Sequence, residues 1–371
     1  ERPSFRILRI RRNEWRTTQS GRDSRVRRKN RSSCILESKY KRCHRLVYAV
    51  LCRVAPKTAY DGYMIRVGTA APPAEGWDIH CHTVFSDGTE TPRALLQEAR
   101  ALRLHGVAIA DHDTTSGWQD ALAASREVRL PLLRGTEITA VDESVSVHML
   151  AFQYDPLNAD ISEMFASTRE ARLRRTKRMV ELMAQDFPIT WDDVLAQVRE
   201  GKRTTIGRPH IADALVAAGV YETRSDAFAD AVSATSKYYI PTPSPTTHDV
   251  VAAVKGAGGV VVIAHAGDPR RNRTLLTDRQ IESLITEGLD GLEVWHRGNP
   301  SEQRERLLTI ARRHDLLVTG GSDWHGKGKP NALGENLTSD ETVQEIINRG
   351  VRLSKESSKA KIKNQNAIID A

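Results

Sequence analysis

Asp78-Ile79-His80-Cys81-His82 is a short stretch in which polar and apolar residues alternate, and Asp87 follows it within Ser86-Asp87-Gly88. In a β-strand, residues two positions apart point to the same side, so this stretch would present two imidazoles together. Imidazoles with a nearby carboxylate suit transition metals such as Zn, Mn or Fe. A single His-x-His pattern is weak evidence, so the rest of the chain must decide its meaning.

Short apolar runs with polar residues at their ends recur along the chain. They are Val107–Ala110 before Asp111, Leu132–Leu133 before Glu137, Val147–Phe152, Val260–Ala264 before His265, Leu292–Trp295 before His296, and Leu316–Thr319 before Asp323. Between many of them lie stretches with apolar residues at helical spacing, such as Thr91–Leu104, Asp278–Thr286 and Ser301–His314. Strands that alternate with helices indicate a parallel α/β architecture, in which buried strands are continuously apolar. Active sites of such folds collect at the carboxyl ends of the strands, where these polar residues stand.

The stretch from about Pro156 to Val250 interrupts this alternation. Apolar residues at helical spacing predict helices over Ile161–Gln185, Trp191–Glu200 and Ile211–Ala218. The proline-rich run Ile240–His248 predicts an irregular return connection. We therefore expect a helical insertion at 157–250, between two parts of the α/β domain at 77–156 and 251–338, with a polar tail at 339–371.

The first 76 residues differ in charge from the rest. The chain has a formal net charge of +8, but residues 1–76 contribute +13 and the remaining 295 contribute −5. This basic arm predicts either an RNA-binding tail or a disordered, non-native extension before a start near Met64. We favour the extension because organised sequence begins only at Trp77. The body is mildly acidic, so bulk positive charge is not its means of binding nucleic acid.

Cysteine use and hydropathy argue against a secreted or membrane protein. Cys34, Cys43 and Cys52 lie in the arm and Cys81 in the body, at spacings that fit neither a zinc site nor a dense disulfide framework. The chain has no apolar run of about 18 residues, and Leu46–Cys52 is too short and too Arg-flanked for a signal peptide. We expect a cytoplasmic protein with no membrane attachment and no obligate protein partner.

The candidate metal ligands come from both ends of the α/β part. They are six histidines and three carboxylates, namely His80, His82, Asp87, His112, Glu137, His148, His265, Asp323 and His325. Nine ligands are too many for one ion, so more than one ion is expected. Cys81 would point to the other face of its strand and pack there.

These motifs resemble the PHP (polymerase and histidinol phosphatase) superfamily of metal-dependent phosphoesterases. Asp78–Gly88 is similar to its first motif, Ala110–Thr114 to its second and Thr319–Gly326 to its last, and the resemblance covers roughly residues 77–338. It implies a distorted (β/α)7 barrel with a trinuclear metal centre.

The insertion also resembles that of one branch of this superfamily. The similar segments are Arg172–Met179, Ile206–His210 and Lys237–Pro241. The branch contains nucleoside 3′,5′-bisphosphate phosphatases and 5′→3′ exonucleases that act on short oligonucleotides. The resemblance therefore implies a small nucleotide or a short oligonucleotide as substrate.

The resemblance further implies how the ligands are shared among three ions. The first ion would have His80, His82, Asp323 and a bridging Glu137; the second Glu137, His148 and His265; the third Asp87, His112 and His325. Adjacent ions lower the pKa of a bound water and neutralise phosphoryl oxygens. The catalytic group would then be a metal-bound hydroxide, held by Glu137, His80, His82 and Asp323, which attacks phosphorus in line without a covalent intermediate.

Other polar residues are expected around these ligands. Asp78, Asp111 and Asp113 are expected to orient imidazoles by accepting their second N–H. Gly207-Arg208-Pro209 should begin a helix, and a guanidinium at a helix N-terminus is a natural phosphate site. We therefore expect Arg208 and His210 to bind substrate phosphate.

Two further assignments stay open at this point. His296 ends a strand on the active face and is either a pocket residue or a packed core residue. The basic run Arg169–Arg178 is either a solvated helix face or supplies one or two groups to a substrate phosphate.

The sequence thus predicts a phosphoesterase that removes phosphate from nucleotides or trims short oligonucleotides from the 5′ end. One alternative is a PHP phosphatase for another small ester, such as histidinol phosphate. A different kind of alternative is a non-catalytic RNA-binding protein that uses the basic arm. Mn, Fe and Zn all accept this mixed ligand set, so the metal is left open.

Overall fold

The computed structural model describes residues 71–271 and 274–351 of the chain, all within a compact unit of residues 66–371. The predicted basic extension at 1–76 lies almost wholly outside these described residues. The polar tail expected from 339 is described only as far as Val351, and this part contains a helix, α11 (Asp340–Arg349). Val343 and Ile346 are buried on one side of α11. The overall polarity of this segment did not reveal the helix.

Seven strands form one sheet in which chain order and spatial order are the same. They are β1 (Trp77–Cys81), β2 (Gly106–Ile109), β3 (Leu132–Asp142), β4 (Val145–Phe152), β5 (Val260–Ile263), β6 (Gly291–Trp295) and β7 (Leu317–Gly320). The sheet nearly closes into a barrel, because the segment after β7 bonds to β1: His82 N donates to Trp324 O at 2.8 Å, and Trp324 N to His80 O at 3.2 Å. The seven-stranded barrel that the resemblance implied is confirmed.

The strand β4 departs from the expected parallel arrangement. It runs antiparallel to both β3 and β5, whereas the other neighbouring strands are parallel. The physical reason is the connection: only Glu143 and Ser144 separate β3 from β4, and a parallel pair needs a crossover of a dozen or more residues. The prediction also ended the third strand before Glu137, but β3 continues to Asp142 and carries Glu137 within it.

Outer helices cover the strands. They are α2 (Pro92–Ala101), α3 (Trp118–Val128), α8 (Thr247–Gly256), α9 (Asp278–Glu287) and α10 (Ser301–His314). Several helices begin at a Thr, Asn or Ser whose side chain accepts a bond from the first turn, which satisfies a backbone N–H that has no partner within the helix. These caps are Thr91, Asn158, Thr190, Thr223, Thr246, Thr277 and Ser339.

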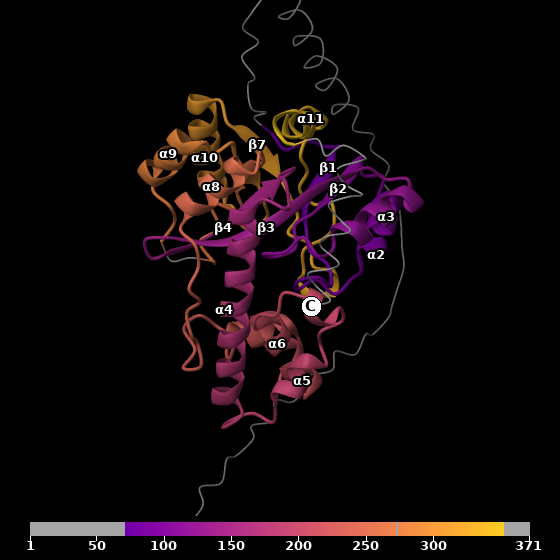
Figure 1. Cartoon of the computed structure of the whole chain (residues 1–371), viewed down its shortest axis with the longest axis vertical. Helices are drawn as coiled ribbons and strands as arrows, with labels where there is room; N and C mark the ends of the chain where they lie inside the picture. The colour runs from indigo at the N-terminus through magenta and orange to yellow at the C-terminus, as the bar shows by residue number, and fades with distance from the viewer. Residues whose placement is uncertain (1–70, 272–273, 352–371) are drawn as a thin grey trace, which may run out of the picture. The chain divides into compact units, whose positions relative to one another are not determined.

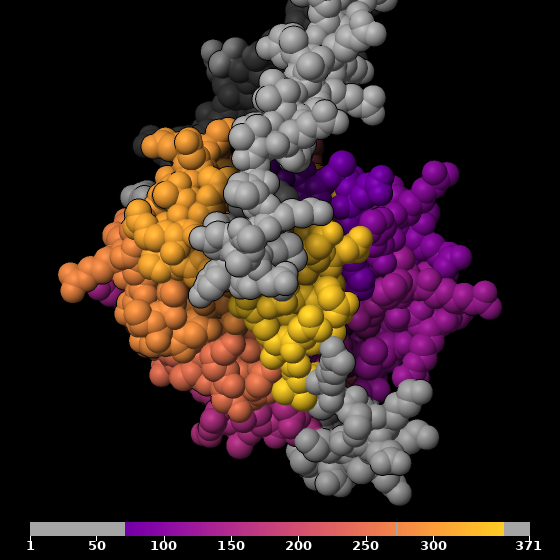
Figure 2. Space-filling model, turned by 90° about the horizontal axis from the view of Figure 1, so that it is seen from above, coloured from indigo at the N-terminus to yellow at the C-terminus, as the bar shows by residue number. Residues whose placement is uncertain are grey.

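Alternate residues of β2, β4 and β5 enter two different hydrophobic clusters. Met149 of β4 packs in the cluster that includes the outer helices, whereas Leu150 and Phe152 pack in the barrel interior. Val343 and Ile346 of α11 belong to this interior cluster, so α11 covers one end of the barrel. In Figure 2 the yellow segment with α11 lies between the indigo residues of the first strands and the orange residues of the later helices.

The insertion between β4 and α8 forms a helical part with its own core. It contains α4 (Ala159–Met183), α5 (Trp191–Leu195), α6 (Arg208–Ala217) and α7 (Arg224–Ala229). In Figure 1, α4 extends away from the strands, and α5 and α6 lie beside its far half. Residues such as Met179, Ile211 and Val232 form the core of this part.

One predicted helix of the insertion is shorter in the structure, and another begins where the sequence predicted. The helix α5 ends at Leu195 rather than at Glu200, because turns and a short 3₁₀ helix (Gly201–Arg203) follow. The helix α6 begins at Arg208 with Pro209 in its first turn, as the Gly-Arg-Pro sequence predicted. Among the helices of the described residues, none combines the length and hydropathy needed to cross a membrane.

Candidate functional site

The polar end of the barrel interior brings together all nine residues predicted as metal ligands. His148 lies on the same face of β4 as Leu150 and Phe152, so the interior is apolar toward α11 and polar toward the insertion. Except for the half-buried His148, each of the nine side chains is buried. Burying so many ionisable groups is costly unless each meets a partner of opposite charge or a metal ion.

Three groups of these residues have ligand atoms close enough to share one ion. They are His80, His82, Glu137 and Asp323; His112, Glu137 and His148; and His82, Asp87, His112 and His325. The first group matches the predicted first set. His82 and His112 each belong to two groups, which the prediction of separate sets did not include.

Glu137 lies at the centre of these groups. Its Oε1 is 2.8 Å from His148 Nδ1 and 3.0 Å from His265 Nε2. Its Oε2 faces the other imidazoles, 3.3 Å from His80 Nε2 and 3.0 Å from His82 Nε2. One carboxylate therefore faces two ligand groups with its two oxygens, as a bridging ligand must.

Asp87 occupies the corresponding position in the last group. Its Oδ1 is 3.2 Å from His325 Nε2 and 3.5 Å from His82 Nδ1, and its Oδ2 is 3.8 Å from His112 Nε2. The loop after β1 thus brings the Asp87 carboxylate close to an imidazole of the same loop and to imidazoles from the loops after β2 and β7.

Unpaired buried atoms test whether this set fits metal ions. Among the described residues, several buried ligand atoms have no hydrogen-bond partner, and they face one another. These atoms are His80 Nε2, His82 Nε2, Asp87 Oδ1, His112 Nδ1, Glu137 Oε2, Asp323 Oδ1 and His325 Nε2. Buried polar atoms without partners are rare in folded proteins unless a bound water or ion satisfies them. The donor set therefore fits several divalent ions.

The ionisation of the site follows from the same proximity. Burial alone would raise the pKa of Glu137, but His148, His112 and His80 hold this pKa well below its usual value. Burial and Lys329 lower the pKa of His325 to about 4. Glu137 and His325 thus have the forms that bind metals, an ionised carboxylate and a neutral imidazole. Burial would lower the pKa of His82, but Asp323 and Glu137 raise it to about 9, so this imidazole must release a proton when a metal binds.

Three site residues have left-handed backbone conformations. The φ angles of Asp113, His265 and Asp323 are 52°, 32° and 54°. Non-glycine residues adopt this region at an energetic cost, which is found mainly where the surrounding structure imposes it for function. Two of these residues, His265 and Asp323, are predicted ligands. Their backbone conformation costs some folding stability and fixes the direction of their side chains.

The three carboxylates that were expected to orient imidazoles have other partners. Asp78 accepts from the backbone N–H of Ser322 at 3.0 Å and of Gly334 at 2.8 Å. Asp111 accepts from Thr83 N at 2.7 Å, and Asp113 from Thr139 N at 2.8 Å. Short acceptor side chains hold loop backbones in this way, so these residues position the loops that carry the ligands.

Glu293, which was not predicted, has the contacts that an orienting residue needs. It is fully buried on β6, its Oε1 lies 2.9 Å from His80 Nδ1, and its Oε2 accepts from His265 N at 2.6 Å. A Cβ on Gly321 would lie 2.7 Å from Glu293 Oε1 and 2.3 Å from His80 Cβ, so only glycine fits beside this pair. A single charged residue inside the apolar run Leu292–Trp295 was the available signal in the sequence.

Replacing Glu293 should therefore weaken metal binding. We expect Glu293→Gln to lower the affinity for Mn²⁺ by about 10- to 100-fold, the usual effect of losing a group that orients a ligand. Calorimetric titration of Mn²⁺ into the metal-free protein measures this change. Glu302→Gln, at an exposed position of α10, is the matched control. An unchanged affinity in Glu293→Gln would refute the orienting role.

The insertion directs arginines toward this end of the barrel. Arg172 of α4 donates to Asp113 Oδ2 at 3.1 Å and to Thr139 Oγ1 at 3.0 Å. Burial, then Arg172 and Arg208, lower the pKa of Arg175 to about 9, the response of a cation with too little negative charge around it. Among the described residues, the buried Nε atoms of Arg172 and Arg175 have no partner.

The other three arginines of the basic run Arg169–Arg178 bond to residues outside the predicted metal site. Arg174 pairs with Glu170, Arg178 with Glu181, and Arg169 donates to Lys202 O at 2.7 Å. Within the run Arg169–Arg178, Arg172 therefore bonds to barrel residues, whereas Arg175 bonds to Thr242 of the insertion.

The two predicted phosphate-binding residues lie at the start of α6. The Arg208 guanidinium lies 5.4 Å from the ring centres of both Phe228 and Tyr239 and donates to Val232 O at 3.0 Å. Burial lowers the pKa of His210 to about 4. His210 Nδ1 accepts from Gly207 N at 3.2 Å, so the neutral ring carries its proton on Nε2, where it can donate.

A second set of basic side chains surrounds Asp323. Lys329 Nζ lies 2.8 Å from Asp323 Oδ2, and Arg271 bonds to the same oxygen. His296 is buried, with Nε2 at 4.0 Å from this oxygen, so it borders the ligand cluster rather than packing elsewhere in the core. These contacts leave Asp323 Oδ1 directed toward His80 and His82.

Comparisons with known proteins found chains that are similar to most of this one. A family model for the PHP domain matches residues 78–222. The chain is 30% identical to the 3′,5′-nucleoside bisphosphate phosphatase of Chromobacterium violaceum, over 68% of this chain and 88% of the relative. It is also 30% identical to a 5′-3′ exoribonuclease of Salmonella typhimurium, over 67% of this chain and 85% of the relative. A crystal structure of a candidate metal-dependent phosphoesterase from Bifidobacterium adolescentis is similar at 81% identity and a TM-score of 0.76, over 76% of this chain and 99% of the other.

Proposed function

This chain belongs to the PHP-domain family of metal-dependent phosphoesterases, and on that premise we propose that it hydrolyses phosphate esters of nucleotides. The proposed substrates are nucleoside 3′,5′-bisphosphates, AMP-like nucleotides or the 5′ ends of short oligonucleotides. The similarity to a bisphosphate phosphatase and to an exoribonuclease supports this substrate class.

The residues proposed to hold metal ions are the nine buried histidines and carboxylates. His80, His82, Glu137 and Asp323 would form one position, His148 and His265 with Glu137 a second, and Asp87, His112 and His325 a third. Ions bound there would activate a water molecule and neutralise the phosphoryl oxygens during an in-line displacement. The unpaired atoms that face one another at this site are the observation that carries the proposal.

The arginines supply the second half of the proposal. Arg172 and Arg175 are proposed to bind a phosphate of the substrate that is not being cleaved. An incoming phosphate would provide the negative charge that Arg175 lacks, and guanidinium groups bind phosphate through paired hydrogen bonds. Arg208 and His210 would contribute a further cation and an N–H donor at the start of α6.

A purified-protein assay with Mn²⁺ tests the proposal. The substrates are adenosine 3′,5′-bisphosphate, AMP, a short 5′-phosphorylated RNA and histidinol phosphate, with released phosphate and mononucleotides as readouts. We expect hydrolysis of at least one nucleotide substrate to exceed that of histidinol phosphate by about 100-fold in kcat/KM, because histidinol phosphate has no second phosphate for the arginines. Equal rates, or histidinol phosphate as the best substrate, would assign the chain to the small-ester branch instead.

A further inference from the structure

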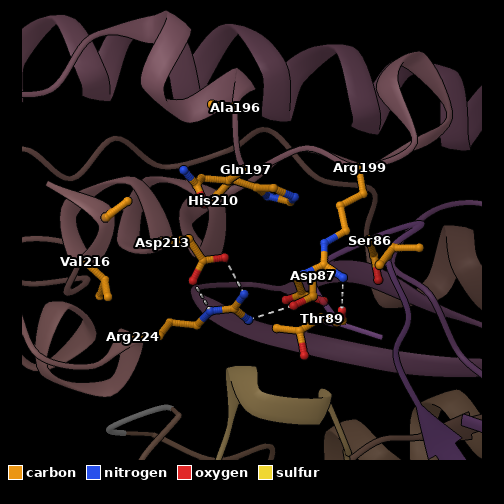
Figure 3. Close-up of a pocket in the computed structure, with 13 residues that line it drawn as sticks. Ser86, Asp87, Thr89, Ala196, Gln197, Arg199, His210, Asp213, Val216 and Arg224 are labelled. Atoms are coloured by element: carbon orange, nitrogen blue, oxygen red, sulfur yellow. Dashed lines mark hydrogen bonds and ion pairs between the residues drawn. The ribbon is translucent and has the colours of Figure 1, made fainter. Parts of the chain in front are cut away.

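A pocket lies between the loop after β1 and the insertion. Its volume is about 390 Å³, and Figure 3 shows Ser86, Asp87 and Thr89 on one side, with Gln197 and His210 opposite. Ligand pockets for small molecules measure roughly 300–1,000 Å³, so this space is sufficient for one ring system with its sugar.

The pocket borders the proposed metal centre directly. Asp87, one of its lining residues, is the carboxylate that lies 3.2 Å from His325 Nε2. His210 lines it as well, and it carries its N–H on Nε2. One end of a molecule bound here would therefore lie next to the proposed metal position of Asp87, His112 and His325, where a phosphate group could bind, and the rest would extend away from it.

The charges of the pocket do not favour a phosphate. Arg224 forms a bidentate ion pair with Asp213, with N–O distances of 2.7 and 2.5 Å. It also donates to the backbone oxygen of Asp87 at 2.6 Å, and the dashed lines of Figure 3 mark these bonds. Arg199 donates to Thr89 O at 2.6 Å. Two cations face two carboxylates here, so the pocket has no excess positive charge, in contrast to the arginines on α4.

The chemistry of the lining suits a neutral ring with a polar edge. Val84, Ala196 and Val216 provide apolar surface, while Gln197 provides an amide group. A nucleobase has two apolar faces and a rim of donors and acceptors, which this combination can contact. The aromatic rings near the arginines are less suitable for stacking a base, because Arg208 already lies over both of them.

We propose that this pocket binds the nucleoside part of the substrate, with the base between the loop after β1 and α6. The inference rests on the proposed function, which it deepens by assigning separate places to the nucleoside and to the uncleaved phosphate. It explains why the insertion is fastened to the loop after β1: Arg224 and Arg199 fix the two walls at a constant separation.

Filling the pocket tests this assignment. Ala196 lines the pocket, whereas its neighbour Leu195 is 41% exposed and does not, so Ala196→Trp and Leu195→Trp form a matched pair. With adenosine 3′,5′-bisphosphate and Mn²⁺, we expect Ala196→Trp to raise KM by about 10-fold or more with kcat within about twofold of wild type. Leu195→Trp should leave both parameters unchanged, and the KM for glycerol phosphate, which has no base, should be unchanged in both variants.

Adenosine as a competitive inhibitor provides the second measurement. We expect adenosine, which has no phosphate, to inhibit the wild type and to inhibit Ala196→Trp about 10-fold more weakly. Should Ala196→Trp fail to fold by circular dichroism, Gln197→Ala replaces it, with a several-fold weaker inhibition expected. An unchanged inhibition constant, or equal losses for the bisphosphate and glycerol phosphate, would overturn the assignment. If the wild type hydrolyses glycerol phosphate but no nucleotide, the proposed function fails instead, which is a distinguishable result.

Discussion

Glu137→Gln is expected to lower kcat for nucleotide hydrolysis by about 10³-fold or more. The two oxygens of Glu137 face imidazoles of two ligand groups, so losing its charge weakens both positions at once. Metal ions contribute several kcal/mol to such reactions, and each 1.36 kcal/mol corresponds to about tenfold in rate. The measurements are kcat with Mn²⁺ and the metal content of the dialysed protein.

The control for this variant lies on the same hairpin. Glu143→Gln changes an exposed residue of the turn between β3 and β4 and should retain the full rate and metal content. Circular dichroism of Glu137→Gln with excess EDTA separates loss of metal from loss of fold. A variant that keeps full metal content and more than about a tenth of the wild-type rate would contradict the bridging role of Glu137.

Arg175→Ala is expected to raise the KM for adenosine 3′,5′-bisphosphate by about 10- to 100-fold while changing kcat little. Hydrogen bonds to charged groups are worth about 1.5–3 kcal/mol, which corresponds to this range. Arg175 bonds to Thr242 but to none of the predicted metal ligands, so its removal should leave metal affinity unchanged. Steady-state kinetics with the bisphosphate and with AMP measure the effect, which should be smaller for AMP.

Arg174→Ala is the matched control for Arg175. Arg174 is the preceding residue of α4, faces solvent and pairs with Glu170, so its loss should alter neither KM. Inorganic phosphate gives a test that needs no catalysis: it should raise the Tm of the metal-free wild type, and by less in Arg175→Ala. Equal stabilisation of both proteins by phosphate would show that Arg175 does not contact the anion.

The apolar runs and the polar residues at their ends were sufficient to predict an α/β architecture, because a continuously apolar run indicates a strand that is buried on both faces. The barrel itself was implied by the resemblance to a known superfamily. The sequence did not show that β4 is antiparallel, because the pattern of His148 and its apolar neighbours fits a buried strand that runs in either direction. Only the short connection at Glu143 distinguishes the two arrangements.

The site could be predicted only in part. The ligands were identified by residue type and motif, whereas partners of Asp78 and the role of Glu293 depend on contacts between residues more than 200 positions apart. The arginines of α4 show the same limit. Helical spacing groups Arg172 and Arg175, but only the folded structure shows that Arg172 contacts Asp113 and that Arg175 bonds to Thr242.

The closure of the barrel by the segment after β7 has a consequence for synthesis of the protein. Asp323 and His325 join ligands from β1, about 240 residues earlier in the chain. During translation, the ion positions that include these two residues cannot be completed until the last strand has left the ribosome. Metal capture that needs the full ligand set would then follow folding rather than guide it, and an interrupted translation product would carry the early histidines without a complete centre.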